Sequence, residues 1–179
     1  MAIRKKILLA TKNRGKLVEI RAILGTDHFE FIPVDSIRMF PEIPETGTTF
    51  TENAIIKAKE SFKLTGIPAL ADDSGLWVYC LDGKPGVYSA RYAGENATDD
   101  ENTDKVLEEI KAFNPPYTAK YVCVLAYYDG KETITTEGEC NGELLLEKKG
   151  FNGFGFDPVF KPTGYDETMA ELDPETKNK

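Results

Sequence analysis

The sequence is poor in the side chains that most often carry metal and nucleophilic chemistry. Its single histidine, His28, stands in the polar segment GTDHFEF, and we interpret it as a solvated turn residue. One histidine excludes a two-histidine metal site, and it allows a catalytic triad only if His28 serves it. If the chain is an enzyme, carboxylates and a hard cation must therefore do the chemistry.

Cysteines and long apolar runs are also scarce. The three cysteines, Cys80, Cys123 and Cys140, are widely spaced and form no CxxC pair. They predict neither a zinc site nor a disulfide framework, and they suit a reducing compartment. No apolar run approaches the ~20 residues that a membrane span needs. The apolar segment within residues 1–10 is also too short for a signal peptide. We expect a soluble, cytoplasmic protein.

Basic residues are outnumbered. The chain has 22 Lys and Arg against 30 Asp and Glu, a formal net charge of −8. Such a surface repels polynucleotide phosphate, so we expect no polynucleotide partner, although a local basic loop can hold a small anion. The length of 179 residues fits a single domain or two small lobes around a shared core.

The order of predicted elements favours an α/β fold. A buried strand at 6–10, a helix ending at Gly25 and a strand at 29–34 open the chain as a β-α-β unit. Capping-box spacing at Thr49 and Glu52, and again at Thr98 and Glu101, predicts two further helix starts. The dipeptide Asp129–Gly130 between two β-rich runs predicts an antiparallel hairpin. We therefore expect a mixed sheet.

A basic turn separates the first strand from the first helix. Backbone N–H groups at a helix start carry partial positive charge and favour an anion such as phosphate. The alternative is a solvated turn, since the GxxxxGK[ST] motif is absent. The candidate phosphate-binding residues are Thr11, Lys12, Asn13, Arg14, Gly15 and Lys16.

The segment Asp72-Asp73-Ser74-Gly75 is predicted to end a short buried strand at 68–71. Ligand sites in open α/β sheets lie beyond the carboxyl ends of strands. Adjacent carboxylates repel unless a cation or proton joins them, and successive side chains of a strand point apart, so one of the two should face the site. The alternative is an Asx-turn.

Two further segments carry candidate binding residues. Around a proline-rich loop, Glu42 and Glu45 are candidate Mg²⁺ ligands, whereas Glu52 is explained as a cap. In Gly153–Pro158, the glycines leave room for a flat ligand, an aromatic ring can stack a base, and Asp157 could accept hydrogen bonds from ring N–H groups. The alternative is a turn that leads into an aromatic core strand. Together these segments predict a nucleotide site without histidine.

Five stretches carry a family resemblance. They are TKNRGK (11–16), ETGTTFTENAIIKAK (45–59), ADDSGLWVYCLDGKPGVYSARYAG (71–94), GFGFDPVF (153–160) and TMAELDPETKNK (168–179). In their residues and order they resemble the inosine/xanthosine triphosphate pyrophosphatases, also called the Ham1-like family. The resemblance implies Mg²⁺-dependent hydrolysis of ITP, dITP and XTP to the monophosphate and pyrophosphate. It also implies a cytoplasmic homodimer whose single domain has an elongated mixed sheet between two α/β lobes.

The resemblance also assigns roles to residues. Asp73 would be the general base and a metal ligand, with Glu42 or Glu45 as the second metal ligand. Ser74 and Lys177 would contact substrate. The triphosphate would bind Thr11 to Lys16, and the base would be held by Phe154, Gly155, Phe156 and Asp157.

One departure from the family pattern concerns the end of the chain. The family continues past a segment like ETKNK into Ser-His-Arg and a final helix, and this sequence stops at Lys179. We therefore expect the domain, residues 1–179, to lack its C-terminal helix. Two alternatives stay open: a Maf-like pyrophosphatase for pyrimidine or modified nucleotides, and a nucleotide-binding module without turnover.

Overall fold

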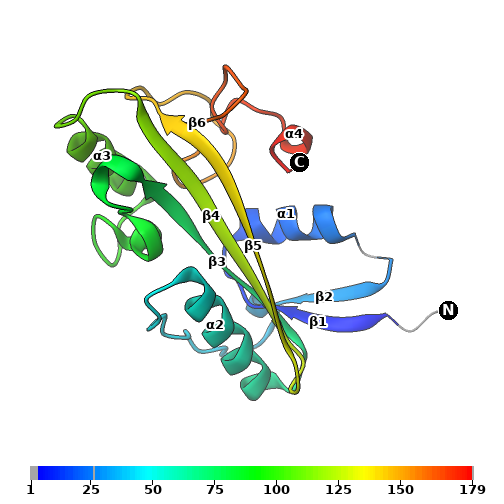
Figure 1. The fold of residues 1–179 in the computed structure, drawn as a ribbon. Coiled ribbons are helices and arrows are strands. Elements are labelled where there is room, and N and C mark those ends of the chain that lie inside the picture. Colours follow the sequence, from blue (N-terminus) through cyan, green and yellow to red (C-terminus); the bar gives the residue numbers. More distant parts are fainter. Residues whose placement is uncertain (1–3, 26, 179) are drawn as a thin grey trace. The chain divides into compact units, whose positions relative to one another are not determined.

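The structure is a computed structural model that describes residues 4–25 and 27–178 (Figure 1). Its main elements are β1 (Lys5–Leu9), α1 (Arg14–Leu24), β2 (Phe29–Pro33), α2 (Phe50–Thr65), β3 (Ala69–Val78), α3 (Asp99–Ile110), β4 (Tyr117–Tyr128), β5 (Thr133–Leu144), β6 (Phe160–Pro162) and α4 (Pro174–Lys177). Short 3-10 helices cover Val34–Ser36, Tyr79–Leu81 and Gly86–Arg91. This alternation of strands and helices confirms the predicted α/β class.

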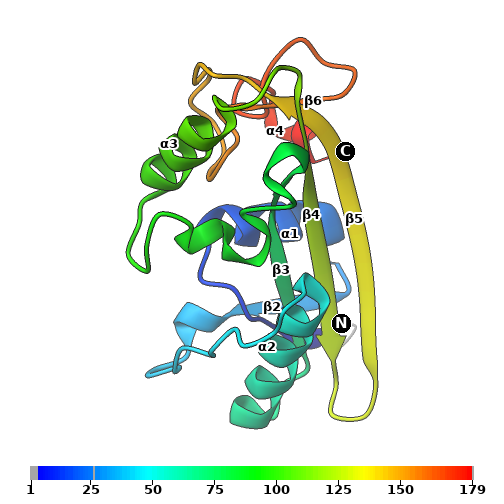
Figure 2. The same ribbon diagram turned by 60° about the vertical axis from the view of Figure 1, so that its left-hand side comes forward.

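Within the described residues, the strands form one six-stranded sheet in the order β2-β1-β3-β4-β5-β6. Strand β1 is parallel to β2 and to β3, whereas β5 and β6 are antiparallel. Figure 2 shows β4 and β5 side by side up to their connecting turn, which contains Asp129 and Gly130. The sheet is therefore mixed and contains the predicted hairpin.

Contacts divide the chain into two compact units. The first unit contains the chain up to Asp73 together with Cys123–Glu137, and the second contains Ser74–Val122 and the chain from Gly138 onward. Each has its own buried core. That of the first unit is formed by Ile7, Leu9, Leu17 and Phe31. The larger core of the second unit includes Leu76, Val78, Val106, Ile110, Phe156, Val159 and Phe160.

The helix boundaries follow the predicted capping signals. The side chains of Thr49 and Thr98 accept hydrogen bonds from the backbone N–H groups of Glu52 and Glu101. In each pair, the glutamate side chain in turn accepts a hydrogen bond from the backbone N–H of the threonine. These pairs satisfy N–H groups that have no partner inside the first helical turn. Helix α1 is followed by Gly25 at φ +66°, a positive value that glycine adopts without a steric penalty.

One predicted boundary is wrong. Strand β3 continues from Ala69 through Asp72–Gly75 to Val78, instead of ending at Asp72. The aspartates read as turn formers because an unpaired carboxylate is costly inside a sheet. In the structure Asp72 and Asp73 pair with lysines, and this pairing allows the strand to continue.

Three further expectations concern membrane-spanning helices, His28 and the cysteines. In the described part of the chain, no helix has both the length and the apolar composition that crossing a membrane requires. His28 is exposed, as expected for a solvated turn residue. Cys80, Cys123 and Cys140 are free thiols.

Candidate functional site

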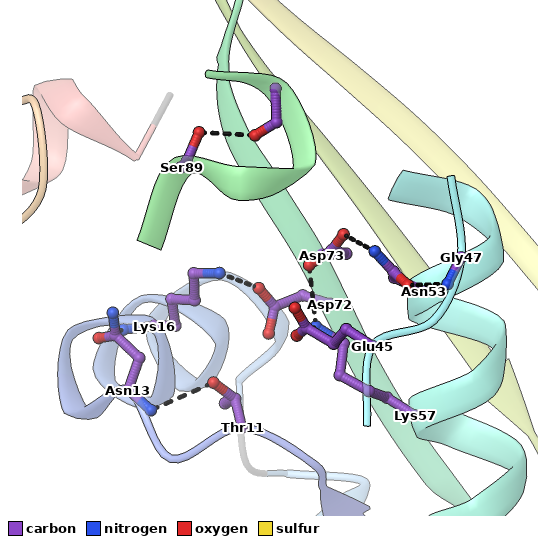
Figure 3. A network of polar contacts seen from close by, with 11 residues as sticks. Thr11, Asn13, Lys16, Glu45, Gly47, Asn53, Lys57, Asp72, Asp73 and Ser89 are labelled. Carbon is purple, nitrogen blue, oxygen red and sulfur yellow. Dashed lines mark hydrogen bonds and ion pairs between the residues drawn. The ribbon is translucent and has the colours of Figure 1, made fainter. Parts of the chain in front are cut away.

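Two buried aspartates lie in the middle of β3. Asp72 is 3% exposed and Asp73 is 6% exposed. Because neighbouring side chains of a strand point to opposite faces, each aspartate meets a different helix. Asp72 forms an ion pair with Lys16 of α1, and Asp73 forms one with Lys57 of α2 (Figure 3). As predicted from the alternation, the two carboxylates point apart and serve different surroundings.

Lys57 joins Asp73 to Glu45. Its Nζ lies 3.0 Å from Asp73 Oδ1 and 2.9 Å from Glu45 Oε1, and its side chain is only 14% exposed. The other oxygen of Asp73, Oδ2, accepts a hydrogen bond from Asn53 Nδ2 at 3.2 Å. Figure 3 shows this group gathered beside the start of α2. The arrangement brings two acidic side chains, 28 residues apart in sequence, to one positive charge.

This environment changes the proton affinity of the pair. Burial raises the pKa of the Asp73 carboxyl above its ordinary value, Lys57 acts in the opposite direction, and the nearby Glu45 adds to the rise. Burial alone would lower the pKa of Lys57, but the charges of Asp73 and Glu45 more than offset it, so the pKa of Lys57 is raised. Lys57 is therefore charged at neutral pH, and Asp73 is more basic than an exposed aspartate.

The start of α2 holds the loop that carries Glu45. Asn53 is fully buried, and its Oδ1 accepts the N–H of Gly47 at 2.8 Å. A Cβ on Gly47 would lie 2.7 Å from that oxygen, so this close approach requires glycine. Glu52 also accepts the N–H of Thr48 at 2.7 Å. These bonds place Glu45 beside Lys57, whereas Glu42 is exposed.

The basic turn between β1 and α1 is arranged as a helix start. Asn13 is the N-cap of α1, and its Oδ1 accepts the N–H of Lys16 at 3.2 Å. The N–H of Asn13 is donated to Thr11 Oγ1 at 3.3 Å. Lys12 and Arg14 are exposed. The positive end of α1 and its basic side chains therefore lie together, but part of the charge of Lys16 is offset by Asp72.

The carboxylates of the first unit suit a hard divalent cation that needs only one or two protein ligands. Among the described residues, no cluster of three or more Asp, Glu, His or Cys side chains could hold a metal ion. However, Glu45 and Asp73 already converge on one cationic group, the ammonium of Lys57. Mg²⁺ usually takes one or two carboxylates and completes its shell with water and phosphate oxygens. Two converging carboxylates therefore fit Mg²⁺.

In the second unit, Asp157 organises the glycine-rich loop. It is 3% exposed. Its Oδ2 accepts the N–H of Phe154 at 2.9 Å and a bond from Lys177 Nζ at 2.7 Å. Its Oδ1 accepts the hydroxyl of Tyr121 at 3.1 Å. Burial first, and then the charge of Asp157, raise the pKa of Tyr121 well above its ordinary value, so this hydroxyl stays a donor.

The two phenylalanines of this loop have different surroundings. Phe156 is 4% exposed and belongs to the core of the second unit, as in the alternative interpretation of a turn leading into an aromatic core. Phe154 is half-buried, and Lys177 Nζ lies 4.6 Å from the centre of its ring. Phe154, not Phe156, is therefore the ring that a flat ligand could reach. Ser74 is half-buried on β3 at the start of the second unit.

Sequence reasoning missed four residues of these networks, Asn53, Lys57, Tyr121 and Asp99. Asn53 and Lys57 are four residues apart on α2, and so share a face next to the apolar stripe of the helix. This polar pair was a usable signal. Tyr121 and Asp99 had no such signal. The bond from the Tyr121 hydroxyl to Asp157 joins segments 36 residues apart, and the bond from the Gly155 N–H to the Asp99 carboxylate joins segments 56 residues apart.

Comparisons with solved structures place this fold in a known class. The structure matches that of a HAM1 protein from Coxiella burnetii with a TM-score of 0.88 and 45% identity, covering 97% of this chain and 90% of the other. It matches the Staphylococcus aureus Ham1 protein with a TM-score of 0.85 and 39% identity, covering 98% and 90% of the two chains. The α/β fold with its mixed sheet is therefore that of the Ham1 proteins.

Sequence comparisons agree with this class. The profile of the Ham1 family matches residues 7–179, and the chain belongs to the Ham1 family. A protein of Oceanobacillus iheyensis named dITP/XTP pyrophosphatase is 47% identical, with 98% of this chain and 90% of the relative covered. A protein of the same name from Geobacter sulfurreducens is 48% identical, over 97% of this chain and 88% of the relative.

Replacing Lys57 by methionine should destabilise the protein. The change leaves the buried Asp73 carboxylate without its ion pair, and breaking a buried pair from one side costs about 3–5 kcal/mol. We expect this loss in chemical denaturation at neutral pH without divalent ions. Lys63→Met is the control, because Lys63 pairs on the surface of the same helix and is 75% exposed, so it should change stability little. Equal effects of the two variants would contradict a structural role for the Lys57 ammonium.

Proposed function

We propose that this protein is a nucleoside triphosphate pyrophosphatase that hydrolyses dITP, ITP and XTP to the monophosphate and pyrophosphate, and so removes deaminated purines from the nucleotide pool. The observation that carries the proposal is the 47–48% identity, over nearly the whole chain, to proteins named dITP/XTP pyrophosphatase. The networks of the two units offer groups that suit the chemistry of this reaction.

Residues Thr11–Lys16 are the proposed triphosphate contacts. They combine the N-terminus of α1 with the cationic side chains of Lys12, Arg14 and Lys16. A helix start and nearby ammonium and guanidinium groups are a common way to hold phosphate. In a chain of net charge −8, this turn provides a local positive potential for an anionic substrate.

Asp73 is the proposed general base. Hydrolysis adds one water across the bond between the α- and β-phosphoryl groups, and one proton must leave that water. A carboxylate whose pKa is raised by burial accepts this proton more readily than an exposed one. Asn53 and Lys57 hold both oxygens of Asp73, which fixes the orientation of the carboxylate.

Mg²⁺ is the proposed cofactor, with Asp73 and Glu45 as its protein ligands. When bound, the ion would neutralise phosphate charge and acidify water. Glu45 is preferred to Glu42 because Glu45 shares the Lys57 ammonium with Asp73, whereas Glu42 is exposed. The proposal therefore names Glu45, and not Glu42, as the second metal ligand.

The loop of the second unit is the proposed base-binding segment. Phe154 offers a ring face, Gly155 leaves space beside it, and Lys177 lies against both Phe154 and Asp157. Both oxygens of Asp157 already accept bonds from the protein. Oδ2 accepts two of these bonds and Oδ1 accepts one, and a carboxylate has about four lone-pair sites, so Oδ1 keeps an acceptor site for a ring N–H of the base. The proposed role of Asp157 is therefore both to shape the loop and to hold the base. Phe156 supports the loop from the core, and Ser74 stays a predicted substrate contact.

Three expectations from the sequence analysis stay predictions. They are the homodimer, the cytoplasmic location and the arrangement of residues 1–179 as one two-lobed domain. A small-molecule purine nucleoside triphosphate is the only substrate that the proposal requires.

The test of the proposed function is a panel of nucleoside triphosphates with Mg²⁺, in which pyrophosphate and monophosphate are measured together. We expect kcat/KM for ITP, dITP and XTP to exceed that for UTP and dTTP by about 100-fold, since a polar site rejects a base that leaves its groups unpaired. Preference for dTTP or UTP would instead support a Maf-like activity. Nucleotide binding without release of pyrophosphate would support a binding module.

Asp73→Asn should abolish most turnover and preserve the fold. The amide is similar in shape to the carboxylate but accepts no proton from water, so we expect kcat to fall by about 100-fold or more. Thermal unfolding of the variant serves as the control for folding. Nearly normal turnover at saturating Mg²⁺ would contradict the assignment of Asp73 as the base.

Glu45→Gln and Glu42→Gln separate the two candidate metal ligands. Both variants remove one negative charge from the same loop, but only Glu45 lies beside Asp73 and Lys57. We expect the Mg²⁺ concentration for half-maximal activity to rise about tenfold in Glu45→Gln and to stay unchanged in Glu42→Gln, because Mg²⁺ sites depend on a few carboxylates. The reverse pattern would assign the metal to Glu42.

A further inference from the structure

The loop Gly153–Asp157 is held by two carboxylates from separate segments. Asp157 holds it from within, through the N–H of Phe154 at 2.9 Å. Asp99, at the start of α3, accepts the N–H of Gly155 at 2.7 Å. Thr103, one turn further along α3, donates its hydroxyl to the carbonyl of Gly155 at 3.5 Å. Both backbone groups of Gly155 are therefore bonded to one face of α3.

Asp99 is not needed to cap α3. Thr98 and Glu101 already form a complete capping box at this helix start. Asp100 has a different partner, Lys148, whose Nζ lies 2.9 Å from Asp100 Oδ1. The neighbouring acidic residues of this turn thus have separate contacts. The bond from Asp99 to Gly155 connects α3 to the loop and has no capping function of its own.

The bond to Asp99 fixes the peptide group between Phe154 and Gly155. The N–H of Gly155 belongs to the peptide group that follows Phe154, so fixing this group fixes the backbone that carries the ring. Gly155 has φ +60°, a conformation that other residues rarely adopt. A cavity of about 340 Å³ borders Phe154 and Gly155 and is lined also by Thr98 and Asp99. The loop and the start of α3 therefore line one cavity, and the bond from the Gly155 N–H to Asp99 joins these two walls.

We propose that Asp99 is a positioning residue for base recognition: its carboxylate, bonded to the Gly155 N–H, orients the Phe154 ring against which the purine stacks. This inference rests on the proposed function of the loop. It predicts that loss of the Asp99 carboxylate weakens contacts with the base of the substrate. The hydrolysis of the phosphate bond itself should be unchanged. A charged acceptor makes a stronger hydrogen bond than a neutral one, so Asp99→Asn should show a partial effect.

The test compares Asp99→Ala with Asp100→Ala, a matched loss of charge in the same helical turn. For Asp99→Ala we expect KM for dITP to rise about tenfold, with kcat within about twofold of the wild type. Hydrolysis of methyl triphosphate, which has no base, should be unchanged. Asp99→Asn should lie between the wild type and Asp99→Ala, and Asp100→Ala should match the wild type. An unchanged KM, or an equal loss with methyl triphosphate, would overturn the proposal, the second because it indicates a general structural defect.

A binding measurement separates this inference from the proposed function. Calorimetry with inosine monophosphate reports recognition of the base without turnover, and we expect Asp99→Ala to weaken this binding about tenfold. If the wild type failed to hydrolyse dITP, the proposed function would fail while the calorimetric comparison still decided the role of Asp99. Equal binding by the wild type and Asp99→Ala, or no binding by either, would overturn the inference.

Discussion

The pairing of two adjacent buried carboxylates with two lysines is the constraint on which the first unit depends. Asp72 and Asp73 lie in the interior of β3, where an unpaired charge is strongly unfavourable. Because a strand directs neighbouring side chains to opposite faces, no single lysine can serve both. Lys16 of α1 and Lys57 of α2 must therefore come from different helices. The candidate base is thus fixed by the same contacts that allow β3 to run through the acidic segment.

The two units use carboxylates in different ways. In the first unit, Asp73 and Glu45 share one ammonium, and a divalent cation could bind the same two carboxylates. In the second unit, Asp157 accepts three bonds from within the protein, from Phe154, Tyr121 and Lys177. A carboxylate has about four lone-pair sites, so most of the acceptor capacity of Asp157 is used to shape the loop. Burial alone therefore does not identify a reacting group, and its hydrogen-bond partners must be counted.

Local signals in the sequence predicted much of the fold. Helices α2 and α3 begin directly after their cap residues Thr49 and Thr98, and α1 ends directly before Gly25. Each of these signals depends only on contacts within one helical turn. The error at Asp72 has the opposite origin, since local preference favours a turn there and contacts with distant helices decide otherwise. The tether between Asp99 and Gly155 was beyond sequence reasoning for the same reason. It joins segments 56 residues apart, and no pattern in either segment refers to the other.

The difference between the two loop phenylalanines follows from the glycines around them. Gly153 has φ +79°, and a Cβ there would lie 2.0 Å from Asp157 Oδ2, so glycine at this position lets the loop fold onto the carboxylate. Gly155, also at positive φ, turns the chain between Phe154 and Phe156. Phe156 then enters the core, and Phe154 stays accessible. Hydrogen bonds from Phe154 to Asp157 and from Gly155 to Asp99 hold the backbone of the loop, so contacts within the protein hold the ring of Phe154 in place. A preformed face lowers the ordering cost of binding, and selectivity then depends on how firmly that face is held.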